Sequence, residues 1–234
     1  MHTRGGLPMG TIFAVAIALL SFVPPPFVGC ARSPAPQADF QPAKVVSVSD
    51  VTIPADSVAM GTVVLQVSIS KEGEIRGVNV RRDIPGETDV AVRSLRAWKF
   101  EPARLNGRAV DSKITIAVTF NPAPPVAADL PLPPLRTQGD ETGTSSHFVP
   151  PEVLHASFPK YPVKALEPRT VILQLVIGPN GEVQHRGVVR DAPPFTTSAL
   201  KAIEDWRFAP ATMNGEPVDS SVVLAFCFRA PVIY

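Results

Sequence analysis

The chain has 234 residues, a formal net charge of +1, 27 prolines and two cysteines. A nearly neutral chain lacks the basic excess typical of proteins that bind nucleic acids or anionic membranes. Only two cysteines occur, Cys30 and Cys227, and if Cys30 is lipidated or removed, Cys227 has no partner and a disulfide framework is excluded.

Residues 1–31 have the features of an export signal. A basic residue precedes the apolar run 11–23, which is too short to span a bilayer and suits a signal peptide. The sequence FVGC ending at Cys30 is similar to a lipoprotein cleavage box, in which Cys30 is acylated. Ordinary cleavage after Ala31 and retention of the run as a membrane helix stay open as alternatives. Residues 32–43 are expected to form a short tether.

The rest of the chain contains an internal repeat. Residues 63–120 recur at 171–228 without a gap. Repetition decides the architecture, and each copy is long enough to fold alone. The sequence therefore predicts two tandem domains, 44–122 and 148–234. The linker between them, 123–147, is Pro-rich and then Gly/Ser/Thr-rich, which predicts a stiff spacer followed by a flexible one.

Within each copy the pattern predicts strand, strand, helix and strand. Period-two alternation indicates the strands, Gly73 and Gly181 mark a hairpin turn, and Pro102 and Pro210 forbid continuation of the helix. The fold class is α+β: in each domain, an antiparallel sheet carries one helix on its apolar face, with strand order left open. The expected strands are 63–69, 75–82 and 114–120 in the first copy, and 171–177, 183–190 and 222–228 in the second.

The helix of the first copy is expected to place Ala91, Leu95 and Trp98 on one face. Thr88 or Asp89 is its expected N-cap. Most residues kept in both copies have a structural interpretation as core, helix exit or Asn-Gly turn. They are Trp98, Phe100, Pro102, Asn106, Gly107, Trp206, Phe208, Pro210, Asn214 and Gly215.

Catalysis finds no support in the sequence. None of the four histidines has metal-ligand spacing to another His or Cys, and no nucleophile elbow or phosphate loop occurs. No pair of acidic residues suited to general acid–base chemistry recurs in the two copies. The prediction is a protein that is not an enzyme and has no cofactor or metal.

The order of motifs resembles the C-terminal domain of TonB, the energy transducer of Gram-negative bacteria. The resemblance rests on Trp98-Lys-Phe-Glu-Pro-Ala103, on Asn106-Gly107 and on a closing strand with Phe120. The second copy matches through Trp206-Arg-Phe208, Pro210-Ala211, Asn214-Gly215 and Phe228. The second copy adds Tyr161-Pro162 but has Arg169 where the family has Gly. The resemblance implies a periplasmic domain that binds an outer-membrane transporter by adding a strand to a sheet edge.

The resemblance points to the closing strand of the second copy as the partner-binding edge. The prediction is a periplasmic protein-binding module, with an envelope scaffold that transduces no energy as the alternative. The two domains are also expected to act bivalently or to associate with each other. The residues of the expected edge are Val222, Val223, Leu224, Ala225, Phe226, Cys227 and Phe228.

Overall fold

The computed structural model describes residues 39–51, 60–121, 131–136, 148–162 and 167–229. The signal segment with Cys30, and most of the tether and linker, lie outside the described residues. The domain boundaries therefore stay predictions at those places. All of the described residues belong to one compact unit.

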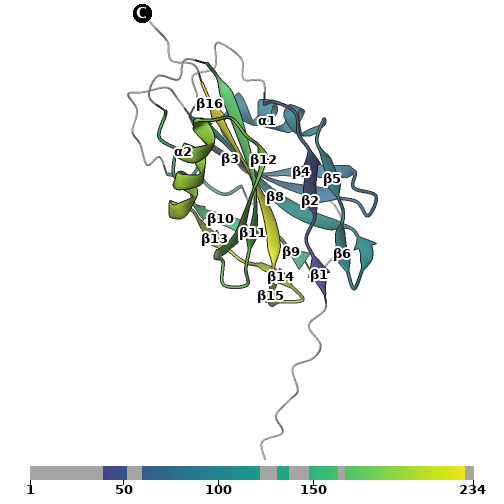
Figure 1. Ribbon diagram of the computed structural model, residues 1–234. Helices are drawn as coiled ribbons and strands as arrows, with labels where there is room; N and C mark the ends of the chain where they lie inside the picture. The colour runs from purple at the N-terminus through teal and green to yellow at the C-terminus, as the bar shows by residue number, and fades with distance from the viewer. Residues whose placement is uncertain (1–38, 52–59, 122–130, 137–147, 163–166, 230–234) are drawn as a thin grey trace, which may run out of the picture. The chain divides into compact units, whose positions relative to one another are not determined.

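The two halves have the same order of elements, and the α+β class is confirmed, with strands dominating and one short α-helix in each half (Figure 1). The first half contains β1 (Phe40–Gln41), β2 (Lys44–Ser47), β3 (Gly61–Ile69), β4 (Ile75–Arg82), α1 (Glu87–Leu95), β5 (Lys99–Glu101), β6 (Ala103–Leu105), β7 (Arg108–Val110) and β8 (Ser112–Asn121). The second contains β9 (Phe148–Val149), β10 (Glu152–His155), β11 (Arg169–Ile177), β12 (Val183–Arg190), α2 (Phe195–Ala202), the 3₁₀ turn η1 (Ile203–Asp205), β13 (Arg207–Ala209), β14 (Ala211–Met213), β15 (Glu216–Val218) and β16 (Ser220–Phe228).

The long strands of both halves form one six-stranded sheet in the order β12-β11-β16-β8-β3-β4. Neighbours are antiparallel except at the centre, where β16 and β8 run parallel and join the halves. Short strands make small satellite sheets, in which β2 pairs with β5 and β10 with β13. The sheet is therefore mixed and shared by both copies.

The register at the centre places the two helices on opposite faces of this sheet. Val222 is the counterpart of Ile114 in the repeat, yet it pairs with Thr115. Because successive side chains of a strand alternate between faces, an offset of one residue turns equivalent positions to opposite sides. Each helix then covers the face that its own half presents to it, as Figure 1 shows for α1 and α2.

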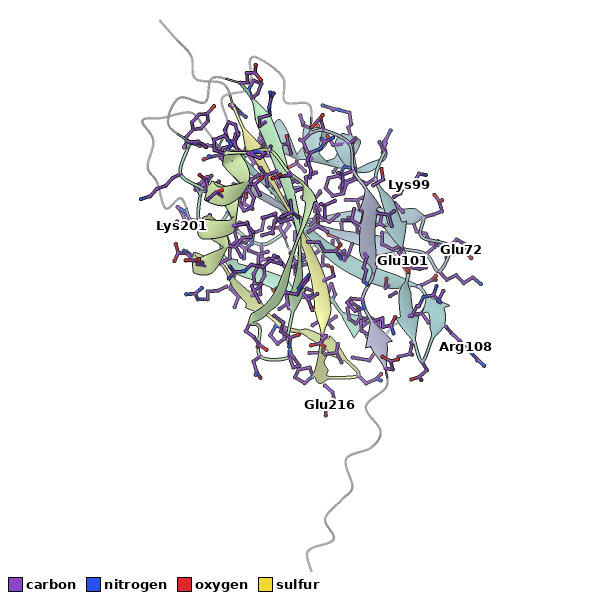
Figure 2. The ribbon with its side chains drawn as sticks, in the orientation of Figure 1. Glu72, Lys99, Glu101, Arg108, Lys201 and Glu216 are labelled. Carbon is purple, nitrogen blue, oxygen red and sulfur yellow. The ribbon has the colours of Figure 1, made fainter. Side chains whose placement is uncertain are left out.

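Two hydrophobic cores result, one on each face, and each contains side chains from both halves. The core under α1 includes Trp98 and Phe120 of the first half, together with Val223, Ala225 and Cys227 of β16. The core under α2 likewise takes Val64 and Ala117 from the first half. The central strands are thus buried on both faces. By contrast, the labelled charged side chains in Figure 2, such as Arg108 and Glu216, lie on the outside.

The turns have the backbone geometry that their residues favour. Asn106-Gly107 and Asn214-Gly215 both adopt positive φ, as a two-residue hairpin of type I′ requires. Gly73 also has positive φ, and a Cβ there would lie 2.3 Å from the carbonyl oxygen of Phe100. Gly181 repeats this contact with Phe208. The hairpin therefore packs directly on the strand after the helix, which only glycine permits.

The helix boundaries differ from the sequence prediction. Helix α1 begins at Glu87 after Gly86 and has no side-chain cap, so neither Thr88 nor Asp89 is an N-cap. The Thr88 hydroxyl is instead hydrogen-bonded to the backbone N–H and C=O of Ile84. The helix ends at Leu95, and Trp98 reaches the core from the turn that follows.

The reactivity of the Cys227 thiol tests the shared sheet, because its side chain faces the core of the opposite half. Burial raises the pKa of its thiol to about 12. In a Cys30→Ser background, we expect no reaction of the native protein with a disulfide reagent at pH 8, and full reaction after unfolding. An exposed control, Lys201→Cys, should react at once. Native labelling of Cys227 at the control rate would contradict the pairing of the halves.

The raised pKa of the Cys227 thiol also predicts that the protein loses stability at alkaline pH. The folded state holds the proton more tightly than the unfolded chain, so this contribution to stability is complete below the ordinary thiol pKa of 9.0. It should be lost as the pH rises from there towards about 12. Urea unfolding of the wild type and of Cys227→Ala across this range measures the difference, which should narrow as the pH rises.

Candidate functional site

The closing strand of the second copy does not provide the expected free edge, and that prediction is wrong. β16 pairs with β11 along its whole length and with β8 from Val222 to Phe228. All nine of its residues are buried. Hydrogen bonding on both sides leaves no backbone groups for a partner strand. The physical reason is its composition: Val222–Phe228 is apolar at every position, as in strands buried on both faces.

The repeated motif residues lie in the core and in turns. Trp98 and Trp206 are buried, and each contacts the Phe two residues later, with ring centroids 6.5 and 6.0 Å apart. The indole N–H of Trp206 donates to the carbonyl of Ser157 at 3.1 Å. These aromatic residues hold each helix exit against the sheet.

The outermost strands of the sheet are β4 and β12. Each carries two bulges, which leave a regular stretch in the middle, Gly77–Val80 in β4 and His185–Val188 in β12. Bulges and basic residues are common devices that limit uncontrolled pairing at sheet edges. Val188 nevertheless remains 47% exposed on β12. These two strands are the positions in the shared sheet where a further strand can add.

A segment of the linker already occupies one end of the β4 edge. The backbone N–H of Arg136 donates to the carbonyl of Arg81 at 2.8 Å, and Arg136 also forms an ion pair with Asp83. Leu132 packs against the core under α2. The described part of the linker thus contacts the protein, and Arg81 of β4 accepts a backbone hydrogen bond from it.

Arg82 and Arg190, which occupy equivalent positions in the two copies, connect the halves. Arg82 forms an ion pair with Glu152 at 3.7 Å and donates to the carbonyl of Val153. Burial lowers the pKa of its guanidinium, and Glu152 opposes that shift. Arg190, its counterpart, forms an ion pair with Asp50. Each arginine therefore reaches the lead-in segment of the other half, a role that the repeat alone did not reveal.

Polar side chains fix the same lead-in segments to the opposite half. Gln174 of β11 donates to the carbonyl of Ala43 at 3.3 Å and accepts from the N–H of Val45 at 3.1 Å. Thr115 of β8 donates to the carbonyl of Pro151, the counterpart of Ala43, at 2.6 Å. These bonds satisfy backbone groups that would otherwise be costly to bury.

A buried ion pair closes the junction at the end of the closing strand. Arg229, just after β16, lies 2.6 Å from Glu87 at the start of α1, and the Glu87 side chain is 1% exposed. The N-terminal end of a helix favours a carboxylate, and the cation neutralises it in a site without water access. The pair links the second half to the helix of the first.

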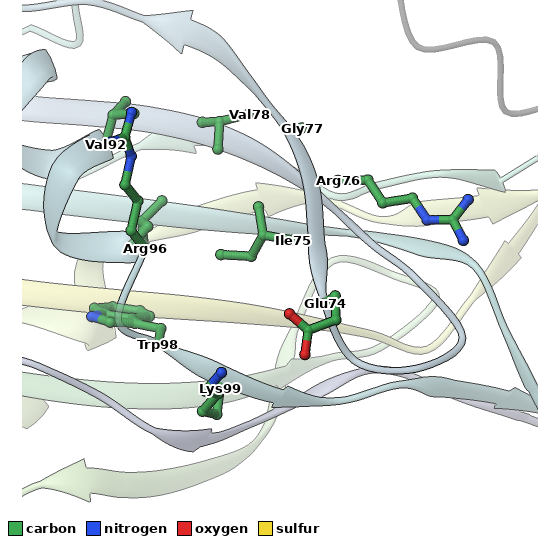
Figure 3. Close-up of a pocket in the computed structure, with 10 residues that line it drawn as sticks. Glu74, Ile75, Arg76, Gly77, Val78, Val92, Arg96, Trp98 and Lys99 are labelled. Atoms are coloured by element: carbon green, nitrogen blue, oxygen red, sulfur yellow. The ribbon is translucent and has the colours of Figure 1, made fainter.

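A pocket of about 410 Å³ lies beside β4, between that strand, the end of α1 and the start of β5 (Figure 3). Its floor is apolar and is formed by Ile75, Val78, Val92, Leu95 and Trp98. Glu74, Arg96 and Lys99 are the charged residues on its rim. The volume falls in the range of sites that take a small molecule or a few side chains of a peptide.

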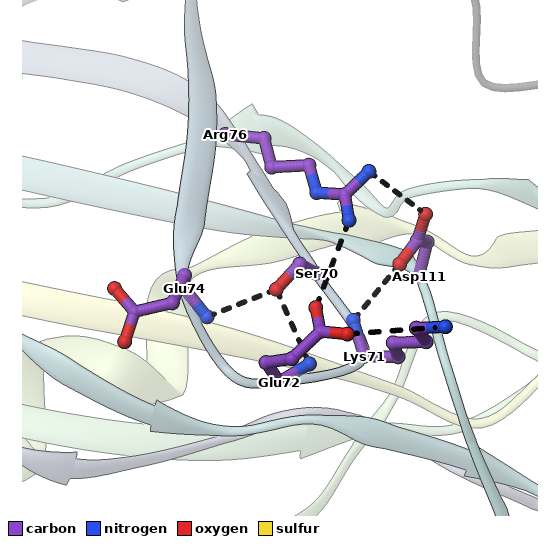
Figure 4. Close-up of polar contacts among 6 residues, drawn as sticks. All are labelled: Ser70, Lys71, Glu72, Glu74, Arg76 and Asp111. Carbon is purple, nitrogen blue, oxygen red and sulfur yellow. Dashed lines mark hydrogen bonds and ion pairs between the residues drawn. The ribbon is translucent and has the colours of Figure 1, made fainter.

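Arg76 also borders the pocket, but its charge is directed elsewhere. It is the extra residue of the bulge between Gly77 and Ile75, and its guanidinium points away from α1 (Figure 3). There it pairs with Glu72 at 3.6 Å and with Asp111 at 3.5 Å (Figure 4). Asp111 also accepts the backbone N–H of Lys71 at 2.8 Å. Arg76 therefore stabilises the hairpin and leaves the pocket rim to the other charged residues.

The described part of the chain contains neither a cluster of metal ligands nor a membrane-spanning helix. Among these residues no group of three or more His, Cys, Asp or Glu side chains is arranged to hold a metal ion. No helix in the same part is long and apolar enough to cross a bilayer.

Comparison with known protein families matches two segments, residues 56–122 and 156–230, to the Gram-negative bacterial TonB protein C-terminal family. The matched segments cover more than half of the chain. The chain belongs to this family. The TonB C-terminal family is non-catalytic, typically periplasmic, and interacts with proteins of the cell envelope. No curated protein matches the chain.

The pair of Arg229 and Glu87 gives a stability test of the junction. Arg229→Ala leaves a buried carboxylate without its cation, which should reduce the free energy of unfolding by roughly 3–5 kcal/mol. The more exposed pair serves as the control: Arg190→Ala should cost less than about 1 kcal/mol. Urea denaturation of both variants measures the two losses. Equal losses would show that the burial of Glu87 does not decide the energetics.

Proposed function

We propose that this protein is a periplasmic binding module that engages an outer-membrane transporter, or another envelope protein, by strand addition at β4 or β12, in TonB-linked transport. Membership of the family supports an envelope protein as the class of partner. The supporting observation for the edges is the pairing of β8 with β16, which uses the closing strands of both halves within the chain. A partner strand is therefore directed to the outer strands.

The bond between Arg136 and Arg81 supports the mode of binding. Addition of a strand relies on main-chain N–H and C=O groups at a sheet edge, and side chains alternating along the added strand give selectivity. β4 already receives one such bond from Arg136 of the linker. β12 offers the same regular stretch at the other end of the sheet, with a different set of side chains.

We further propose that the chain is exported and anchored through an acylated Cys30. Cleavage after Ala31 or retention of the signal segment as a membrane helix are the competing outcomes, and each leaves a different mature N-terminus. Intact mass of protein purified from membranes distinguishes them. Acyl mass on a chain that starts at Cys30 supports the anchor, and a chain that starts at Arg32 or Met1 overturns it.

A scaffold without energy transduction is the second candidate, and the continuous sheet favours it. Because β4 and β12 are the two ends of one sheet, the protein is suited to hold two envelope proteins at a fixed separation. A scaffold should recover two different partners through the two edges. A transport module should recover a transporter.

Site-specific photocrosslinking tests the proposed edges. A photoreactive residue at Val188 of β12 or Asn79 of β4 should capture an envelope protein, because a strand added at either edge would contact the residue placed there. The controls are Arg108 and Glu216, which are exposed beside the turns of the satellite hairpins and belong to neither β4 nor β12. Hydrogen exchange of the purified complex should show new protection in Gly77–Val80 or His185–Val188. Capture at the control positions with no protection of either edge would rule out strand addition there.

A further inference from the structure

The pocket beside β4 is the most distinctive surface feature of the first half. Its apolar floor ends on the buried ring of Trp98, and Ile75 and Val78 project towards α1 from β4 (Figure 3). The bulge at Arg76 makes this possible, since it brings two residues three positions apart onto the same side of the strand. The floor suits one bulky apolar side chain.

The rim of the pocket carries two cations, Arg96 and Lys99, that pair with no acidic residue in the described part of the chain. Arg96 and Lys99 are both exposed, and no ion pair among the described residues uses either side chain. Glu74 lies on the rim near the hairpin, whereas Arg96 lies at the end of α1 (Figure 3). The rim is therefore complementary to a ligand that carries a negative charge on its helix side.

The second half lacks this combination of side chains. The counterpart of Arg96 is Glu204, and Gly77 and Val78 are replaced by the larger His185 and Arg186. Both His185 and Arg186 are exposed on β12. An acidic ligand would meet a like charge at Glu204 and would find bulkier side chains in place of the opening. The two halves are thus expected to differ in what they bind.

We propose that the pocket receives two side chains of an acidic peptide segment that adds to the edge of β4. A bulky apolar side chain enters over Trp98, and a carboxylate two residues along the peptide binds Arg96 at the end of α1. Residues i and i+2 of a strand point to the same face, so one added strand places both groups on the side of α1. The inference rests on the proposed strand addition and specifies the chemistry of the partner at this edge.

Short synthetic peptides test this inference on the full chain. The probe has a central Phe with Glu two positions away, in an otherwise Thr- and Val-rich sequence. Matched peptides carry Lys for Glu or Ala for Phe. We expect the probe to bind and both matched peptides to bind at least about tenfold more weakly, which corresponds to roughly 1.4 kcal/mol. Fluorescence anisotropy of a labelled peptide gives the dissociation constants.

Substitutions in the protein test whether the peptide binds in this pocket. Arg96→Glu, which gives the first half the residue of the second, should weaken the Glu peptide about tenfold and strengthen the Lys peptide. Glu204→Arg is the matched control in the second half and should leave the affinity unchanged. Val78→Arg fills the opening and should abolish binding, and circular dichroism checks that each variant is folded.

The outcomes separate this inference from the function on which it rests. Equal binding of the Glu and Lys peptides, or no effect of Arg96→Glu, overturns the pocket assignment. If crosslinking at Asn79 still captures a partner in that case, strand addition stands. A probe with alternate backbone nitrogens methylated cannot form the ladder and should not bind. Undiminished binding of the methylated probe overturns strand addition itself.

Discussion

The parallel ladder between β8 and β16 is the constraint on which the rest of the structure depends. It joins two copies of the same fold through equivalent strands, and its offset of one residue turns their helices to opposite faces. Every long central strand then has a core on each face, which explains why Ala117 and Cys227 are as buried as Phe120. Arg82, Arg190, Gln174 and Thr115 then bind the lead-in segments of the opposite half.

The ladder also redistributes the surfaces that remain for partners. A lone copy would present its closing strand, but in this chain that strand is the centre of a sheet. The accessible strands become β4 and β12, which are among the parts where the copies differ in charge and size. Duplication has therefore kept the fold while giving the two edges different chemistry.

Local structure was largely predictable from the sequence, whereas strand order was not. Asn106-Gly107, Gly73 and the alternation of β3 specify turns and a strand through short-range sterics. The ladder depends on contacts between positions far apart in the chain, which periodicity does not report. One local signal was present: Val222–Phe228 has no polar residue, so both of its faces need a core. The lead-in strand β2 is only four residues long and stands out only in its tertiary context.

Placing both copies on one polypeptide makes their pairing unimolecular. Two separate chains joined by the same ladder would dissociate on dilution, because their association depends on concentration. Here the linker keeps the partner strand at a high effective concentration whatever the abundance of the protein. The central edges therefore stay covered even when only a few molecules are present, and the choice of binding surface does not vary with expression level.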